Sequence, residues 1–325
     1  MEKSRPFISV IIPTYERSGQ LSVCLGALAA QDYPRDRFEV LVVDDGSATS
    51  PEGSVGTFRH QLNVRLLEQL HSGPAAARNH GAAHAKGAFL AFTDDDCAPI
   101  PGWLQSLATC FVSCPDCTLG GRTINELANN PYSTVSQLVV DYLYAHWNSD
   151  PEHATFFTSN NLALPAQSFY ALGGFDASWT RAAGEDRELC DRLISCGYRL
   201  MYVPDALVRH AHPLTFRTFW RQHFNYGRGA YSLHRLRACH DARGIRVEPL
   251  GFYLRMLGYP FARTQGRRAA LLAALLAVAQ AANLAGFLWQ GFCQDPPPPR
   301  LTHDQGQSHT TGARCAATNR EKRED

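Results

Sequence analysis

The longest acidic run in the chain is Asp94-Asp95-Asp96, which follows Thr93. Adjacent carboxylates repel one another unless a positive group neutralises them. Hard divalent cations such as Mg²⁺ and Mn²⁺ prefer such oxygen ligands and normally share them with phosphate oxygens. A metal held there would stabilise the negative charge that develops on a departing diphosphate. A solvated acidic turn is the alternative, but the run follows the apolar residues 88–92, and this position favours a metal site.

A second acidic pair, Asp44 and Asp45, precedes Gly46 and Ser47. A carboxylate at this point could accept hydrogen bonds from a nucleoside base or from a ribose hydroxyl. Asp and Gly are also common in β-turns, so the sequence leaves both interpretations open.

A third acidic pair, Glu185 and Asp186, follows Gly184 at the start of a predicted helix. A carboxylate there could remove the proton from an attacking hydroxyl group. It could instead only complement the positive end of the helix dipole. Further along the chain, His210 and His212 follow a predicted strand, where either could add a nitrogen ligand to the metal.

Four apolar segments in the first hundred residues have the length and composition of buried strands. They span residues 7–12, 38–43, 63–68 and 88–92. Helical spacing over 17–31 and an alanine-rich stretch after Pro74 lie between them. This alternation predicts an α/β domain with a mainly parallel sheet, in which ligands bind at the carboxyl ends of the strands. Three strands end in polar residues, at 13–16, 44–47 and 93–96, so we expect these segments to meet.

Shorter elements are predicted in the second part of the chain, from about residue 120 to 212. They are a turn at 173–176, a helix at 186–196, short strands at 198–203 and 206–209, and a basic helix at 217–237.

The chain of 325 residues is long enough for one large domain, and its formal charge of +1 gives no general attraction to nucleic acid. We therefore expect no nucleic-acid partner. The first residues lack the pattern of a signal peptide, which predicts a cytoplasmic protein. Cys110, Cys114 and Cys117 are then expected to be reduced thiols near a helix end. A zinc site is the less favoured alternative, because no second CxxC or HxxxH pair completes four ligands.

Residues 269–294 contain no charged side chain and follow Arg267 and Arg268. The segment is long enough to span a bilayer, but it is rich in alanine and includes Gln280, Asn283 and Gln290. Insertion is marginal on this composition. A spanning helix, a hairpin in the membrane interface and a helix packed on the domain all remain open. The polar tail at 295–325 is predicted to be disordered.

The order of motifs over roughly residues 7–212 resembles glycosyltransferase family 2, which has the GT-A fold, a Rossmann-like mixed sheet flanked by helices. Seven segments carry the resemblance: 10–17 (VIIPTYER), 42–47 (VVDDGS), 73–79 (GPAAARN), 92–96 (FTDDD), 158–161 (TSNN), 173–176 (GGFD) and 184–186 (GED). It implies a domain at 1–265, with a nucleotide-binding half at 1–119 and an acceptor-side half at 120–240. A hydrophobic helix at 266–294 would follow.

The resemblance also implies an inverting enzyme that uses a nucleoside diphosphate sugar, with a UDP-sugar as the first candidate, and Mn²⁺ or Mg²⁺. Pro13, Tyr15 and Glu16 would line the nucleotide pocket. Asp45 would reach the base, and Arg78 would lie near the base or the phosphates.

For the reaction centre, the resemblance assigns three kinds of role. Asp94 and Asp96 would be metal residues, with Asp96 the more direct ligand and Asp94 also nearer the ribose, and His210 would be a further ligand. Asp186 would be the catalytic base. On the donor-sugar and acceptor side it places Asn160, Gly174 and Glu185.

One motif departs from the family's processive polysaccharide synthases, which carry QxxRW after the base. Here Gln222 is followed by Asn225-Tyr226, so we expect transfer of one sugar or a few.

The acceptor would be a glycan, a lipid or a small molecule, at the cytoplasmic face of the membrane if 269–294 associates with it. The alternative is an inactive module that binds nucleotide sugar or glycan, but intact Asp94, Asp96 and Asp186 argue against it.

Overall fold

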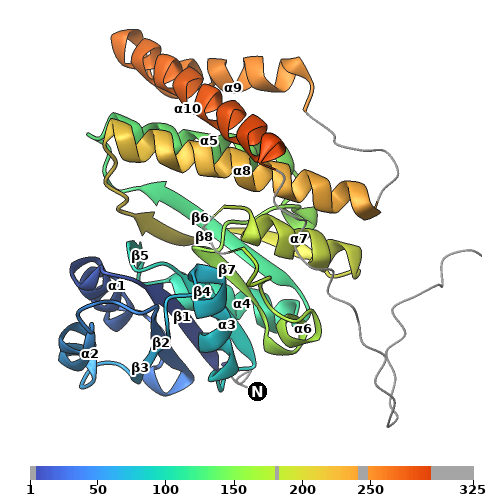
Figure 1. The fold of residues 1–325 in the computed structure, drawn as a ribbon. Helices are drawn as coiled ribbons and strands as arrows, with labels where there is room; N and C mark the ends of the chain where they lie inside the picture. The colour runs from blue at the N-terminus through green and yellow to red at the C-terminus, as the bar shows by residue number, and fades with distance from the viewer. Residues whose placement is uncertain (1–4, 180–182, 241–247, 294–325) are drawn as a thin grey trace, which may run out of the picture.

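The computed structural model describes residues 5–179, 183–240 and 248–293, and its centre is one eight-stranded mixed sheet (Figure 1). The spatial order of the strands is β3-β2-β1-β4-β7-β6-β8-β5. The strands are β1 Ile8–Thr14, β2 Phe38–Asp44, β3 Val64–Glu68, β4 Phe89–Thr93, β5 Cys97–Pro99, β6 Thr118–Asn125, β7 Asn161–Pro165 and β8 Leu200–His210.

Helices cover both faces of this sheet. Those of the α/β part are α1 Ser18–Ala29, α2 Glu52–Phe58, α3 Pro74–Ala83, α4 Trp103–Ser113, α6 Ala166–Ala171 and α7 Glu185–Ser195. Alternate residues of β1 point to opposite faces. Val10 packs in the core with α1 and α4, whereas Ile11 packs with α3, α6 and α7. Both faces of the sheet are covered, and this explains why the sequences of β1 and β2 are nearly continuous apolar runs, from which buried strands were predicted.

The first four strands confirm the predicted parallel arrangement. β1 pairs in parallel with both β2 and β4, and β2 pairs in parallel with β3. The carboxyl ends of β2, β1 and β4 therefore lie side by side. β7 then pairs antiparallel with β4 and β6, which makes the sheet mixed.

The prediction of two short strands at 198–203 and 206–209 was wrong, because β8 is one strand from Leu200 to His210. Its pairing with β6 shifts register between Gly121 and Arg122, so that Pro204 and Asp205 lie in a bulge. A bulge accommodates a proline, which has no N–H group for the ladder. Pro204 and Asp205 therefore did indicate an irregularity, but it is a bulge within β8 and not the end of a strand.

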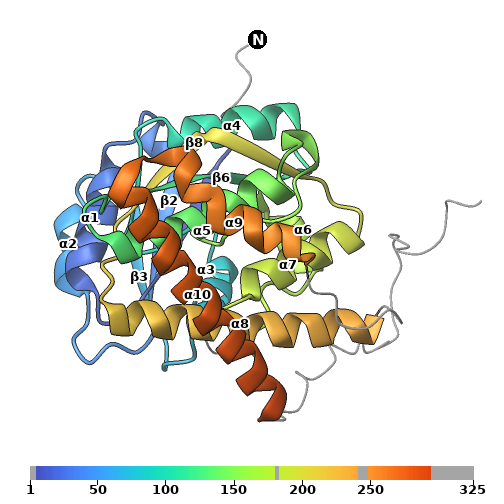
Figure 2. The same cartoon turned by 90° about the horizontal axis from the view of Figure 1, so that it is seen from above.

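Four further helices form a layer on one side of the sheet (Figures 1 and 2). They are α5 Pro131–Trp147, α8 Phe216–His240, α9 Leu250–Arg263 and α10 Gly266–Phe292, and they share an apolar core of their own. The basic helix and the apolar helix of the sequence analysis correspond to α8 and α10. The predicted tail at 295–325 lies outside the described residues.

Helices α8 and α10 cross with their backbones in contact (Figure 2). A Cβ atom added at Gly227 of α8 would overlap the backbone oxygen of Asn283 in α10. One added at Gly286 of α10 would overlap the backbone oxygen of Phe224 in α8. Glycines at both positions therefore allow a close approach that any other residue would prevent.

Within the described part of the chain, α10 is the one helix long and apolar enough to cross a membrane. Only 28% of its most apolar window is buried inside the protein. The other residues of α10 are half-buried or exposed, and Leu284, Leu288 and Phe292 are among the exposed ones.

Cys114 and Cys117 form a disulfide just after α4, so the prediction of two reduced thiols was wrong for this pair. The chain reverses direction at the helix end and brings their Cα atoms to 5.5 Å, within the usual range for a disulfide. Cys110 lies one turn earlier in α4 and stays free. The error came from inferring the redox state from the expected compartment rather than from the local geometry.

Candidate active site

The polar segments that follow β1, β2 and β4 meet at one edge of the sheet, as the sequence predicted. Pro13 lies within β1 opposite Val43 of β2. The exposed ring of Tyr15, next to it, lies 4.4 Å from the ring of His71. The Glu16 carboxylate accepts a hydrogen bond from the backbone N–H of Ala48 at 2.7 Å. These residues lie together at the carboxyl ends of β1 and β2.

Asp45 is buried and holds the loop that leads into α3. Its carboxylate accepts hydrogen bonds from the side chain of Gln69 at 2.7 Å and from the backbone N–H groups of Ser72 and Gly73 at 2.8 and 2.9 Å. This loop carries His71 against Tyr15. Asp45 thereby fixes the shape of the surface on which Tyr15 lies.

The three adjacent aspartates have different main partners, although Arg17 contacts both Asp95 and Asp96. Asp94 accepts a hydrogen bond from Nη2 of Arg78 at 2.7 Å. Asp95 points back into the sheet, where it accepts from Oγ1 of Thr14 at 2.8 Å and lies 3.3 Å from Nη1 of Arg17. Asp96 points the other way, toward the end of β8. The middle aspartate is therefore a buried support and not part of the open site.

Asp96 lies between two histidines. Its Oδ1 is 3.2 Å from Nε2 of His210, its Oδ2 is 3.0 Å from Nδ1 of His212, and Nη1 of Arg17 is 3.1 Å from the same Oδ2. Pairing of β5 with β8 puts Cys97 opposite His210, which is why residues so far apart in sequence meet.

The histidines determine the charge of Asp96. Burial opposes its ionisation, but the hydrogen bonds from His210 and His212 outweigh burial and hold the pKa of the carboxyl well below its usual range. Burial likewise disfavours a charged His210, yet Asp96 raises the pKa of that imidazole above its ordinary value. Asp95 is different, because burial raises the pKa of its carboxyl to about 6.

Asp96, His210 and His212 have the composition of a metal site. Their ligand atoms all lie within 4.8 Å of one another. One carboxylate and two imidazoles suit a divalent transition metal such as Mn²⁺. Asp94 is not a member of this cluster, since its carboxylate faces Arg78.

Arg78 of α3 is buried and connects Asp94, which precedes the proposed metal ligands, to α7. Its Nη2 binds Asp94, and its Nη1 lies 3.2 Å from Oε1 of Glu185. The other oxygen of Glu185 accepts from the backbone N–H of Ala183 at 2.9 Å. The three side chains form a continuous row of alternating charge, Asp94–Arg78–Glu185.

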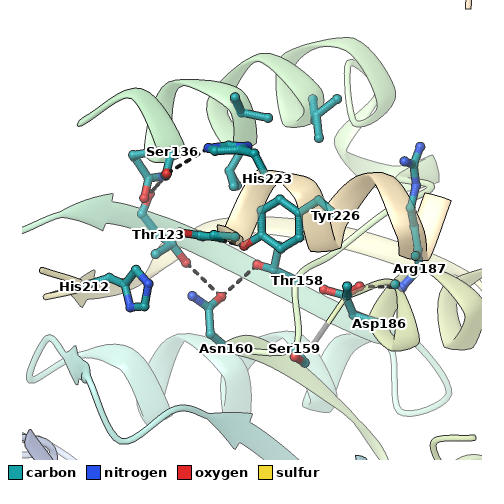
Figure 3. A pocket seen from close by; sticks show the side chains of 18 of the residues that line it. Thr123, Ser136, Thr158, Ser159, Asn160, Asp186, Arg187, His212, His223 and Tyr226 are labelled. Atoms are coloured by element: carbon teal, nitrogen blue, oxygen red, sulfur yellow. Dashed lines mark hydrogen bonds between the residues drawn. The ribbon is translucent and has the colours of Figure 1, made fainter. Parts of the chain in front are cut away.

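Asp186 follows Glu185 at the start of α7 and lines the cavity shown in Figure 3. Its Oδ1 accepts from the backbone N–H of Arg187 at 2.8 Å. Burial raises the pKa of both Glu185 and Asp186 above that of an exposed carboxyl group. The Arg187 guanidinium stacks on the ring of Trp147 at 3.7 Å from the centroid, and its charge only partly offsets the effect of burial on the pKa of Asp186.

The cavity has a volume of about 270 Å³ and lies between the sheet and the layer of α5, α8 and α10. Asn160 lines its floor, where Oδ1 accepts hydrogen bonds from the hydroxyls of Thr158 at 2.7 Å and Thr123 at 3.4 Å (Figure 3). His210, His212 and Asp94 line one end of the cavity, and Asp186 also faces it. The structure thus brings the proposed metal ligands and the proposed base to one space.

Gly174 does not line this cavity. Its φ of +74° requires the left-handed conformation, and its carbonyl accepts from Nη2 of Arg192 at 2.7 Å. The amide of Asn79 binds the backbone N–H and C=O of the next residue, Phe175, at 2.9 and 2.7 Å. This turn therefore fastens α3 to α7, and its influence on the site is indirect.

Several cavity residues escaped the sequence analysis. Gln280 and Asn283 of α10 were treated only as obstacles to membrane insertion, but both line the cavity. Their spacing of three residues in an apolar helix places them on one face, and this was the available signal. His223 and Tyr226 of α8 line the same space and were passed over within a basic helix.

Comparison with known families and proteins places this geometry among sugar-transferring enzymes. The family Glycosyl transferase family 2 matches residues 9–179, and Glycosyl transferase family group 2 matches residues 119–292. Glycosyltransferase AglE of Haloferax volcanii is 28% identical over 256 residues, which cover 70% of this chain and 74% of that protein. The pre-mycofactocin glycosyltransferase of Mycobacterium tuberculosis is 32% identical over 231 residues, which cover 70% of this chain and 47% of that protein. The chain thus spans about half the length of that second relative.

Two solved structures share the fold. The mannosyltransferase PcManGT from Pyrobaculum calidifontis, in complex with GDP-Man and Mn²⁺, matches with a TM-score of 0.61 at 22% identity, over 90% of this chain and 89% of that one. TarS of S. aureus in complex with UDP-GlcNAc matches with a TM-score of 0.51 at 19% identity, over 86% and 89%. The predicted GT-A fold is thereby confirmed.

Proposed function

Because the chain belongs to glycosyl transferase family 2 and is a glycosyltransferase, we propose that it moves one sugar from a nucleoside diphosphate sugar to an acceptor hydroxyl, with inversion at the anomeric carbon. One observation carries this proposal. Asp94 and Glu185 are both paired with Arg78, whereas Asp186 has no ion pair among the described residues, and the cavity that Asp186 lines is also lined by His210 and His212 of the proposed metal cluster.

The nucleotide is proposed to lie over the ends of β1 and β2. Tyr15 offers an exposed ring for the base, while Pro13 and Glu16 form the edge of the same surface. Asp45 is proposed to act by fixing the loop beneath the base, since its oxygens already accept three hydrogen bonds. PcManGT was solved with GDP-Man and TarS with UDP-GlcNAc, and for this chain we propose a UDP-sugar.

Asp96, His210 and His212 would hold a divalent metal, for which Mn²⁺ is the first candidate and Mg²⁺ the second. The bound metal would supply positive charge for the leaving diphosphate. Asp94 is proposed to lie next to the ribose, and Arg78 fixes its direction.

Asp186 is proposed to be the base. As the acceptor oxygen forms its bond to the anomeric carbon, Asp186 takes the hydroxyl proton, and the diphosphate leaves with the electron pair of the broken glycosidic bond. One base is enough for inversion, because the displacement occurs in a single step. A raised pKa suits this role, since a carboxylate that is more basic than usual accepts a proton more readily near neutral pH. Asn160 and Glu185 would shape the surface on which the donor sugar lies.

The proposal is tested by calorimetry with UDP, GDP and dTDP, each with and without Mn²⁺, followed by a donor panel with nucleotide release as the readout. We expect metal-dependent binding of one nucleotide and turnover of one of its sugars. Binding that does not depend on metal would contradict the metal site. Binding without any turnover would favour the alternative, a module that only holds nucleotide sugar or glycan.

The outer face of α9 and α10 is proposed to rest on the cytoplasmic surface of a membrane. Leu254, Phe261 and Phe292 are exposed there, although an isolated soluble domain has no evident use for them. From Leu250 to Cys293 the chain has four arginines and no acidic residue, a charge that suits anionic lipid. Extraction of membranes with carbonate should release the protein if it lies on the surface, and should leave it in the pellet if α10 spans the bilayer.

A further inference from the structure

The two sides of the cavity differ in chemistry. The side formed by the sheet and α7 carries charged groups, among them Arg78, Asp94 and Asp186. The side formed by α5, α8 and α10 carries hydroxyl, amide and apolar side chains, with no Asp, Glu, Lys or Arg among the described lining residues. A ligand that filled the whole cavity would therefore meet ions at one end and neutral groups at the other.

Three amide groups on the helical side keep hydrogen-bonding groups that no described residue uses. Gln222 donates from Nε2 to the hydroxyl of Tyr226 at 2.7 Å, but its Oε1 is buried without a hydrogen bond. The half-buried side-chain amides of Gln280 and Asn283 make no hydrogen bond to a described residue. A buried oxygen such as Oε1 of Gln222 is normally paired, because leaving it unpaired is costly. An amide offers both a donor and an acceptor, which is what a sugar hydroxyl also requires.

The imidazole on this side adds no charge. His223 is buried, and its Nε2 lies 3.2 Å from the hydroxyl of Ser136 (Figure 3). Burial lowers the pKa of His223 to about 4, so the ring is neutral at pH 7. The groups that face it from α5 and α8 are likewise uncharged, namely Ser136, Phe219 and Tyr226.

The two cations that line the cavity are already engaged. Arg78 binds two carboxylates, and the Arg187 guanidinium lies over the Trp147 ring. A phosphate or carboxylate on the helical side would therefore find no free cation among the described lining residues. An uncharged ligand group needs no such cation to compensate for its removal from water.

The backbone that carries Asn283 is held in place. Asn283 lies where α10 touches Gly227 of α8, and the backbone contact at Gly286 lies three residues further on. Only the side chains, and not the helix, therefore need to be ordered when a ligand binds.

From these observations we infer that the space beneath α5, α8 and α10 is the acceptor subsite. It takes an uncharged group with several hydroxyls, such as a sugar ring, and Gln222, Gln280 and Asn283 bind those hydroxyls and direct one of them toward Asp186. The inference rests on the proposed function, since it assigns the acceptor side of the same cavity.

The test compares Gln280→Leu, Asn283→Leu and the double variant with Ala281→Leu. The control places the same new side chain on the same helix at an exposed position. Binding is measured by saturation-transfer NMR and calorimetry in the presence of UDP and Mn²⁺, with methyl glucosides, methyl mannosides and methyl galactosides as probes and glucose 6-phosphate as an anionic comparison.

We expect at least one neutral glycoside to bind the wild-type protein more tightly than glucose 6-phosphate. Each single variant should weaken that binding about threefold to tenfold, with UDP affinity unchanged. The melting temperature of the ligand-free variants should stay constant or rise, because an apolar residue replaces an unpaired amide. If the amides were structural, the melting temperature would fall instead.

Two results would overturn the inference: preference for the sugar phosphate, or no neutral glycoside bound. Unchanged glycoside binding in the double variant would overturn it as well. The proposed function fails separately, by absence of nucleotide binding or of turnover in the donor panel. These readouts do not depend on Gln280 or Asn283.

Discussion

Nδ1 of His212 lies 3.0 Å from Oδ2 of Asp96, although 116 residues separate them in the chain. The contact exists because β5, which follows Asp96 directly, pairs with β8, which ends at His210. The proposed metal ligands therefore come together only when both halves of the sheet have formed.

Replacing His212 with Ala should weaken Mn²⁺ binding by at least about tenfold, a loss reached even when groups outside the ligand shell are changed. Asp96→Asn should weaken it further, because the carboxylate is the one anionic member of the cluster. Calorimetry with Mn²⁺ and UDP measures both effects. His153→Ala, at an exposed position, is the control, and equal Mn²⁺ affinity in all variants would remove these residues from the metal site.

Replacing Asp186 with Asn should lower the rate of transfer by roughly 10²- to 10⁴-fold, the usual contribution of a general base. Nucleotide affinity should not change, since Asp186 lies at the other end of the Asp94–Arg78–Glu185 row. Asp191→Asn is a matched control on the same helix, where the carboxylate pairs with Arg237 at the surface. Retained transfer in Asp186→Asn would exclude this residue as the base.

The pH dependence of transfer should reflect the burial of Asp186. Only the ionised carboxylate can accept the proton, so kcat/KM rises with pH as Asp186 loses its own proton. Because burial raises the pKa of Asp186, this rise should lie above the range of an exposed aspartate, which titrates at about 3.9. Rates between pH 4.5 and 8, with folding followed by circular dichroism, provide the measurement. A rate already constant from pH 4.5 upward would speak against a buried base.

Gly173 and Gly174 offer a matched pair for measuring the role of the turn. Both have positive φ, +79° and +74°, but an added Cβ meets nothing within 4 Å at Gly173 and lies 2.6 Å from Oδ1 of Asn79 at Gly174. Gly173→Ala should lower the free energy of unfolding by about 1–2 kcal/mol. Gly174→Ala adds a clash and should lower it by about 2–5 kcal/mol.

Urea unfolding of the two glycine variants measures the difference. Since φ is nearly the same at the two positions, the excess loss in Gly174→Ala measures the close contacts with Asn79 and, at 3.2 Å, with the ring of Phe169. Equal losses would mean that the Asn79 side chain moves aside freely.

Sequence patterns predicted the parallel strands and the meeting of the three polar segments, because buried parallel strands are apolar throughout and end in loops that share one edge. They also identified Asp96, His210 and Asp186 as candidates, which now line or border one cavity. Their catalytic roles remain predictions.

Other features depend on tertiary contacts that no local pattern encodes. Asp94, Asp95 and Asp96 are chemically identical in the sequence, and only the positions of Arg78, Thr14 and His212 distinguish them. The disulfide of Cys114 with Cys117 was missed for a different reason, because the redox state of the cysteines was inferred from the expected compartment.

The close crossing of α8 and α10 limits how this enzyme could change its substrate. Since the backbones touch at Gly227 and Gly286, the two helices cannot be pressed nearer, and a larger side chain at either glycine would force them apart. The separation of these two helices over the cavity is therefore fixed by the main chain. Selection or engineering for a bulkier substrate would have to act by trimming side chains such as Leu143 or Leu233, which line that space.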